Sequence, residues 1–234
     1  MLTIAIGYDH RESIAYHVLA HSIMRRASRP IRIIPIHLGT LRNIFTRERS
    51  PMQSTDFTYA RFLTPYLAED NQVSVFLDCD MLCLTDICEL EDIALTNLHS
   101  DVLVVKHDYM PSTEDKFLGA KQTVHPCKNW SSVMVFNGHR QAVKNLTPEY
   151  VNKAEPMDLH QFKWAKEVGS LDPAWNHLVG EYTPNPAAKI VHFTLGGPYF
   201  AGYANCEYSK EWFDELGDTL HRDSPSFCLE RIWT

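Results

Sequence analysis

The sequence lacks the short motifs that mark several large enzyme classes. Its 234 residues contain no Walker loop, no Gly-x-Ser-x-Gly and no Gly-x-Gly-x-x-Gly. These absences argue against P-loop nucleotidases, α/β-hydrolases and Rossmann dehydrogenases. The six cysteines form no Cys-x-x-Cys pair and no zinc-ligand spacing. We therefore expect reduced thiols in a cytosolic protein, without disulfides or a structural zinc site.

An excess of positive charge and long apolar runs are also lacking. Acidic residues outnumber basic ones by 29 to 22, which argues against nucleic acid or anionic membrane as the main partner. The cluster Arg42, Arg47 and Arg49 is interpreted as a solvated loop face, with phosphate or acceptor contact as the alternative. No run approaches the ~20 apolar residues of a membrane span. The apolar stretch 2–6 is too short for a signal peptide, so we expect a cytoplasmic protein.

Hydrophobic periodicity predicts an α/β protein. Residues 2–8 form an apolar run, residues 11–26 carry apolar groups on one helical face, and residues 31–38 form a second apolar run. A strand, a helix and a strand in this order are typical of a βαβ unit and predict a parallel sheet. Asp9 and Glu12 have the spacing of a capping box at the start of the helix.

The same reasoning assigns the rest of the chain to one domain, residues 1–234, with a C-terminal elaboration. Pro65 is expected to end or kink one of its helices. A long functional loop is predicted between the strands at 101–106 and 132–136, over residues 107–129. The other strands are expected at 73–77 and 189–193, and the other helices at 57–67, 87–95, 139–145, 158–167 and 207–221.

Two carboxylates follow the apolar strand at 73–77, in the order Asp78-Cys79-Asp80. Ligands bind beyond the carboxyl ends of strands in open α/β sheets. Paired carboxylates suit Mg²⁺ or Mn²⁺ and leave coordination positions free for phosphate oxygens. A metal-bound nucleotide is the first hypothesis for this place, while acidic residues that simply form a turn are the alternative.

A histidine ends the late strand in a similar way. His192 is followed by Gly196, Gly197 and Pro198, and the two glycines allow backbone to approach a ligand closely. An imidazole beside two carboxylates shifts the preference from Mg²⁺ toward Mn²⁺. The alternative is a histidine satisfied by backbone groups at a Gly-Pro turn.

These segments together resemble a known family. The Asp78-Cys79-Asp80 motif, the preceding Tyr59-Ala60-Arg61-Phe62, and His192 with its Gly-Gly-Pro-aromatic tail are similar to GT-A-fold glycosyltransferases, nearest to the retaining, family-8-like group. The resemblance implies an α/β fold whose mixed, mostly parallel central sheet is flanked by helices. It also implies metal-dependent transfer of a hexose from a nucleotide sugar, a uridine-linked one by preference, to a hydroxyl acceptor of unknown identity.

The resemblance further implies roles for particular residues. Asp80 would bind the Mn²⁺ or Mg²⁺ ion most directly, Asp78 would contact both metal and ribose, and His192 would be the third ligand. Residues 1–106 would bind the nucleotide, and residues 107–234 the sugar and the acceptor. The candidate catalytic residues are Arg61, near the diphosphate or sugar, and Asp158 with Gln161, against the donor sugar. The remaining donor contacts are Gly7, Tyr8 and Asp9 at the base, and Cys79, Gly196 and Gly197 in the donor-binding segments.

Some alternatives remain open. Asp158 and Gln161 also fit a solvated helix face, and Trp175 with Asn176 fits either a sugar or acceptor pocket or a buried ring beside a turn. His17 and His21 lack the acidic partner of a zinc motif, so we expect satisfied or exposed side chains.

One departure from the family pattern bears on activity. The lysine that often follows the His-Gly segment is missing, because the chain continues as Gly197-Pro198-Tyr199. Another cation replaces it, or donor affinity is weaker, or activity is lost. The alternatives to a transferase are a sugar nucleotidyltransferase, disfavoured because residues 7–12 lack a glycine-rich loop, and a non-catalytic nucleotide-sugar-binding relative.

Overall fold

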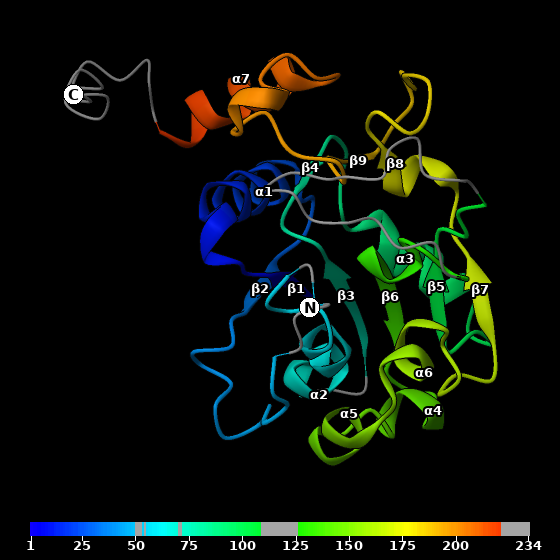
Figure 1. Ribbon diagram of the computed structural model, residues 1–234. Helices are drawn as coiled ribbons and strands as arrows, with labels where there is room; N and C mark the ends of the chain where they lie inside the picture. The colour runs from blue at the N-terminus through cyan, green and yellow to red at the C-terminus, as the bar shows by residue number, and fades with distance from the viewer. Residues whose placement is uncertain (50–52, 54, 70–71, 109–125, 221–234) are drawn as a thin grey trace.

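The computed structural model in Figure 1 describes residues 1–49, 53, 55–69, 72–108 and 126–220. Its centre is a six-stranded sheet in the order β2-β1-β3-β6-β5-β7. β1 pairs in parallel with β2 and β3, and β5 with β7, whereas β6 runs antiparallel to β3 and β5. The predicted mixed, mostly parallel α/β sheet is confirmed. The strands are β1 (Leu2–Gly7), β2 (Ile31–Ile36), β3 (Val73–Leu77), β5 (Val102–Val104), β6 (Val133–Asn137) and β7 (Val168–Ser170).

A second, three-stranded sheet consists of β4 (Met81–Cys83), β9 (Ile190–His192) and β8 (His177–Leu178). β9 is antiparallel to β4, with His192 opposite Met81, and parallel to β8. The N–H of Phe193 continues the pairing by donating to the carbonyl of Asp80 at 2.9 Å. This small sheet therefore joins the late histidine strand to the mid-chain carboxylates.

The central strands are apolar and buried on both faces, as expected for strands covered by helices. Figure 1 shows α7 beside α1, on the side of the molecule that also carries β4 and β9. None of the described helices has the length and apolar surface needed to cross a membrane. The helices are α1 (Ser13–Arg26), α2 (Thr64–Ala68), α3 (Glu89–Thr96), α4 (Gln141–Lys144), α5 (Pro148–Lys153), α6 (Pro156–His160) and α7 (Ser209–Thr219).

Two predicted helices are shorter than expected. In place of a helix over 57–67, a 3₁₀-helix at Ala60–Leu63 leads into α2. Pro65 lies in the first turn of α2, where its missing N–H costs nothing, so it neither ends nor kinks the helix. In place of a helix over 158–167, α6 ends at His160, because Phe162 adopts a left-handed φ of 57°.

The predicted capping box is only half formed. The Asp9 carboxylate accepts the backbone N–H of Arg11 at 3.0 Å and so caps the short 3₁₀-turn before α1. The Glu12 carboxylate does not return to Asp9, since it accepts a hydrogen bond from Tyr199 instead. Most of the predicted loop at 107–129 lies outside the described residues.

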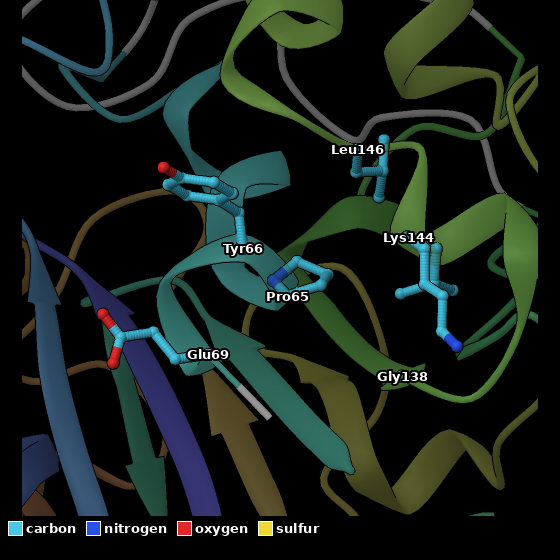
Figure 2. A pocket seen from close by; sticks show the side chains of 7 residues that line it. Pro65, Tyr66, Glu69, Gly138, Lys144 and Leu146 are labelled. Atoms are coloured by element: carbon cyan, nitrogen blue, oxygen red, sulfur yellow. The ribbon is translucent and has the colours of Figure 1, made fainter. Parts of the chain in front are cut away.

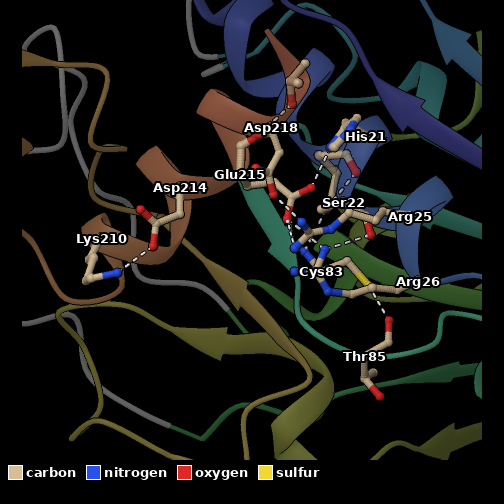
Figure 3. A network of polar contacts seen from close by, with 12 residues as sticks. His21, Ser22, Arg25, Arg26, Cys83, Thr85, Lys210, Asp214, Glu215 and Asp218 are labelled. Carbon is tan, nitrogen blue, oxygen red and sulfur yellow. Dashed lines mark hydrogen bonds and ion pairs between the residues drawn. The ribbon is translucent and has the colours of Figure 1, made fainter. Parts of the chain in front are cut away.

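A polar network attaches α7 to α1 (Figure 3). The Glu215 side chain, 1% exposed, lies 2.5 Å from Nδ1 of His21 and accepts from Nη1 of Arg26 at 2.8 Å. Arg25 approaches the same carboxylate at 3.2 Å. His21 is thus satisfied, as expected, and its partner Glu215 attaches one helix to the other.

We predict that Glu215→Ala lowers the free energy of unfolding by about 2 kcal/mol, because several charge-assisted hydrogen bonds to a buried carboxylate are lost. The loss in free energy stays below that for a fully buried ion pair, since the side chains of His21, Arg25 and Arg26 reach water. Urea denaturation measures it. Asp214→Ala, which removes an exposed pair with Lys210 on the same helix, is the matched control and should lower the free energy of unfolding far less. Equal losses in the two variants would contradict a clamping role for Glu215.

Candidate metal centre

Asp78, Asp80 and His192 converge at the junction of the two sheets. Asp78 follows β3, Asp80 precedes β4, and His192 ends β9. Nε2 of His192 lies 3.3 Å from Oδ1 of Asp80 and 4.0 Å from Oδ2 of Asp78. The three ligand atoms lie within 4.8 Å of one another. Adjacent ligands of an octahedral Mg²⁺ lie about 3 Å apart, so these two oxygens and one imidazole nitrogen fit a divalent cation after a small contraction.

Arg61 balances one of the two carboxylates. Its guanidinium is almost completely buried, and Nη1 lies 2.8 Å from Oδ1 of Asp78. The same nitrogen donates to the carbonyl of Ser131 at 2.8 Å, and Nε donates to the carbonyl of Thr58. The arginine predicted to lie near the donor is therefore held against a candidate metal ligand by two carbonyls.

Cys79 points away from this group. Its side chain is fully buried in the core, and burial raises the pKa of its thiol well above the usual range. Since the thiol is enclosed, any contact of this residue with a donor would come from its backbone.

The two glycines after His192 are explained by aromatic packing. A Cβ on Gly196, whose φ is 152°, would lie 2.6 Å from the ring of Tyr203. A Cβ on Gly197 would lie 2.2 Å from the ring of Tyr199. Both glycines are thus required without any ligand, and their predicted contact with a donor stays a prediction.

Glu12 is a residue of this region that the motifs did not reveal. The carboxyl is buried, and Oε1 accepts the Tyr199 hydroxyl at 2.6 Å. Burial, followed by the negative charge of Asp80, raises the pKa of Glu12 to about 8. Its position three residues after Asp9 imitated a capping box, which hid its inward orientation.

The base-binding segment predicted at residues 7–9 follows β1 directly. Asp9 is buried and paired with Arg11, whose Nε donates to Oδ1 at 2.9 Å. Asp9, His10 and Asp56 also bring three potential ligand atoms together. Arg11 and Arg49 already neutralise the two carboxylates of this second group, so ion pairing accounts for it. A Cβ on Gly7 would meet the Phe57 ring at 2.5 Å, while the Tyr8 ring packs edge-on against Tyr16 and His37.

The structure does not join Asp158 and Gln161 to the metal cluster by a hydrogen bond or ion pair among the described residues. Asp158 is partly exposed and pairs with Lys163 at 2.6 Å, and Gln161 lies just past the end of α6. His160 between them turns inward, with Nδ1 2.9 Å from the Ser131 hydroxyl. Because the Ser131 carbonyl accepts from Arg61, His160 is the residue of α6 that is linked to the centre. No sequence motif identifies His160.

Asn176 also lies at this centre, and His107 is a further buried histidine. Oδ1 of Asn176, which is completely buried, lies 3.0 Å from Nδ1 of His192, so this residue contacts the candidate ligand and not an open pocket. Trp175 beside it belongs to the core. His107 lies 3.0 Å from the hydroxyl of Tyr182, and burial lowers its pKa to about 3. A neutral imidazole is therefore expected there at any working pH.

A cavity of about 330 Å³ lies elsewhere, between α2 and the segment around α4 (Figure 2). None of the predicted site residues lines it. The lining consists of Pro65, Tyr66, Glu69, Gly138, Val143, Lys144 and Leu146.

We predict that the metal-free parent is less stable at about pH 8 than at about pH 5, and that Glu12→Gln removes this pH dependence. The native carboxyl holds its proton up to about pH 8, whereas the unfolded one loses it above its ordinary value of 4.5. Since the native state binds more protons in this window, the parent loses about 3 kcal/mol of stability as the pH rises, and the glutamine variant lacks this loss. Denaturation at both pH values in the presence of a chelator measures the difference. Glu211→Gln, at an exposed position, is the control; parallel pH profiles for parent and Glu12→Gln would refute a protonated Glu12.

Comparison with known proteins assigns the chain. The model of "Glycosyl transferase family 8" matches residues 7–196. Protein CDI of Arabidopsis thaliana is 42% identical over 222 residues, covering 91% of this chain and 85% of the relative.

Solved structures show the same fold. The bifunctional glycosyltransferase WbbM aligns over 93% of this chain with a TM-score of 0.63 at 18% identity, and GlyE of Streptococcus pneumoniae TIGR4 over 92% with 0.60 at 12%. The chain spans half of the WbbM chain and 59% of the GlyE chain. The galactosyltransferase LgtC, solved with donor and acceptor sugar analogues, aligns over 92% of this chain and 95% of its own, with a TM-score of 0.56 at 13% identity. The architecture is that of GT-A glycosyltransferases, and the chain is a glycosyltransferase that belongs to family 8.

Proposed function

We propose that this protein transfers a hexose from a nucleotide sugar, UDP-hexose by preference, to a hydroxyl acceptor in a metal-dependent reaction. The observation that carries the proposal is the convergence of Asp78, Asp80 and His192 at the ends of three strands. Retention at the anomeric carbon is proposed from family membership alone. A cytoplasmic location stays a prediction from the sequence.

Asp80, Asp78 and His192 would hold the cation, Mn²⁺ in preference to Mg²⁺ because one ligand is an imidazole. When bound, such an ion supplies Lewis-acid stabilisation of the charge that develops on the departing nucleoside diphosphate. Arg61 holds Asp78 in place, since its guanidinium lies against that carboxylate and against two carbonyls. These charged groups are held in position before the reaction. Preorganised groups of this kind stabilise the charge that develops in a transition state.

The donor contacts are proposed on the same basis. Residues 7–9 at the end of β1 would hold the base, Asp78 the ribose, and the turn after His192 would border the diphosphate. Asp158 on α6 and Gln161 just after it would face the donor sugar. His160 between them holds this end of α6 to Ser131. In this arrangement residues 1–106 bind the nucleotide, and residues 107–234 bind the sugar and the acceptor.

A non-catalytic nucleotide-sugar-binding protein is the second candidate, favoured by one specific observation. Where the family often has a lysine before Pro-Trp, this chain has Gly197 before Pro198 and Tyr199, and the Tyr199 hydroxyl is committed to Glu12. A screen of nucleotide sugars in the presence of Mn²⁺, read out as released nucleotide, separates the candidates. Turnover of one donor, even slow hydrolysis, supports a transferase, whereas binding without turnover across acceptors supports the non-catalytic protein.

We predict that Asp80→Ala abolishes Mn²⁺-dependent binding of uridine diphosphate and leaves the thermal transition of the ligand-free protein nearly unchanged. The carboxylate is a ligand in the proposal and is not part of the apolar core. Calorimetric titration of uridine diphosphate with and without Mn²⁺ measures this effect. Asp214→Ala, which removes an acid on α7, should bind like the parent. Equal metal-dependent affinity in Asp80→Ala and the parent would exclude Asp80 from the site.

We predict that His192→Ala weakens Mn²⁺ binding more than Mg²⁺ binding, because imidazole nitrogen favours the softer ion. Competition between the two ions, followed by the paramagnetic relaxation of water by free and bound Mn²⁺, gives both affinities. The same proportional loss for both ions would rule out coordination through His192.

A further inference from the structure

Asn176 makes the only side-chain hydrogen bond to His192 that the described residues display, and it makes it from a completely buried position. We propose that Asn176 is a positioning residue, which fixes the ring orientation and the tautomer of His192 so that the unprotonated Nε2 faces the two carboxylates. The tautomer itself follows from the hydrogen bonds, whereas its use in binding a metal ion rests on the proposed function.

The direction of the hydrogen bonds follows from the partners of the amide. Nδ2 of Asn176 lies 3.2 Å from the backbone carbonyl of Asn129 and 2.8 Å from the hydroxyl of Ser132. A carbonyl oxygen can only accept, so the amide nitrogen must face it and the amide oxygen must face His192. An amide oxygen can only accept as well. The proton of the neutral imidazole therefore lies on Nδ1, and Nε2 carries a lone pair.

The lone pair is directed to a place where a cation is needed. Nε2 lies 3.3 Å from Oδ1 of Asp80. A lone pair and a carboxylate oxygen at this distance repel each other unless a proton or a cation lies between them. Metal-binding histidines commonly use their other ring nitrogen in this way, donating it to a carbonyl or carboxylate that orients the ring. An asparagine oxygen performs the same task here.

One short turn supports both sides of the cluster. The Ser132 hydroxyl, which accepts from Asn176, donates in turn to the Asn129 carbonyl at 2.6 Å. The backbone carbonyl of Ser132 accepts the N–H of Asp78 at 3.0 Å. The turn 129–132 thus holds Asp78 through the backbone and His192 through Asn176, and it sets their separation.

The test compares Asn176→Ala with Asn176→Asp in metal-free protein. Alanine removes the acceptor, whereas aspartate keeps an oxygen toward Nδ1, loses the two donations to the turn and adds a buried carboxyl group. The nitrogen-15 chemical shifts of His192, recorded at a pH at which the ring is neutral, show which nitrogen carries the proton. We expect Nδ1–H in the parent and in Asn176→Asp, and loss of that preference in Asn176→Ala. Mn²⁺ affinity should fall about 10- to 100-fold in Asn176→Ala and be largely rescued in Asn176→Asp.

Asn152→Ala is the matched control, because the Asn152 amide also bridges two backbone groups but lies on α5. It should lower stability and leave the His192 tautomer and Mn²⁺ affinity unchanged. An unchanged tautomer in Asn176→Ala would overturn the positioning role, whatever happens to stability. Failure of the parent to bind Mn²⁺ would instead overturn the proposed function, while the tautomer comparison, made without metal, would still decide the role of Asn176.

Discussion

The antiparallel pairing of β4 with β9 is the constraint on which this site depends. It places Met81 opposite His192 and joins Phe193 to the carbonyl of Asp80, so backbone geometry fixes an imidazole beside two carboxylates. These strands belong to a small sheet separate from the six-stranded one. The central sheet therefore supplies one rim of the site, the small sheet supplies the other, and neither would bring the three ligands together alone.

Bringing several acids to one place costs free energy unless each charge is compensated. The structure compensates them in different ways. Asp9 pairs with Arg11 and Asp78 with Arg61, whereas burial keeps Glu12 protonated in the metal-free protein. Asp80 faces the imidazole of His192. A divalent cation held by Asp78 and Asp80 would therefore mainly compensate the charge of Asp80, because Arg61 already faces Asp78.

The sequence predicted those features that have a local signature. A buried apolar run ending in Asp78 and Asp80, and another ending in His192, placed all three groups at strand ends, because short apolar runs bounded by turn residues favour strands. The partners of these groups have no such signature. Glu12 fits a helix-capping pattern, and only the packing of the turn after His192 brings Tyr199 to it. His160 was overlooked because α6 was expected to continue, whereas Phe162 turns the chain out of the helix.

The packing around Gly196 and Gly197 explains why this turn has no lysine. Tyr199 and Tyr203 occupy the space beside Gly196 and Gly197, so a long cationic side chain in this turn would have to displace a packed ring. The Tyr199 hydroxyl instead donates to Glu12, whose pKa is raised to about 8. A protonated Glu12 adds no negative charge, so an incoming diphosphate meets one carboxylate fewer than the residues suggest. Removing a negative charge near an anion acts in the same direction as adding a positive one. In the proposed function, a protonated Glu12 would therefore offset part of the loss of a lysine at the position of Gly197.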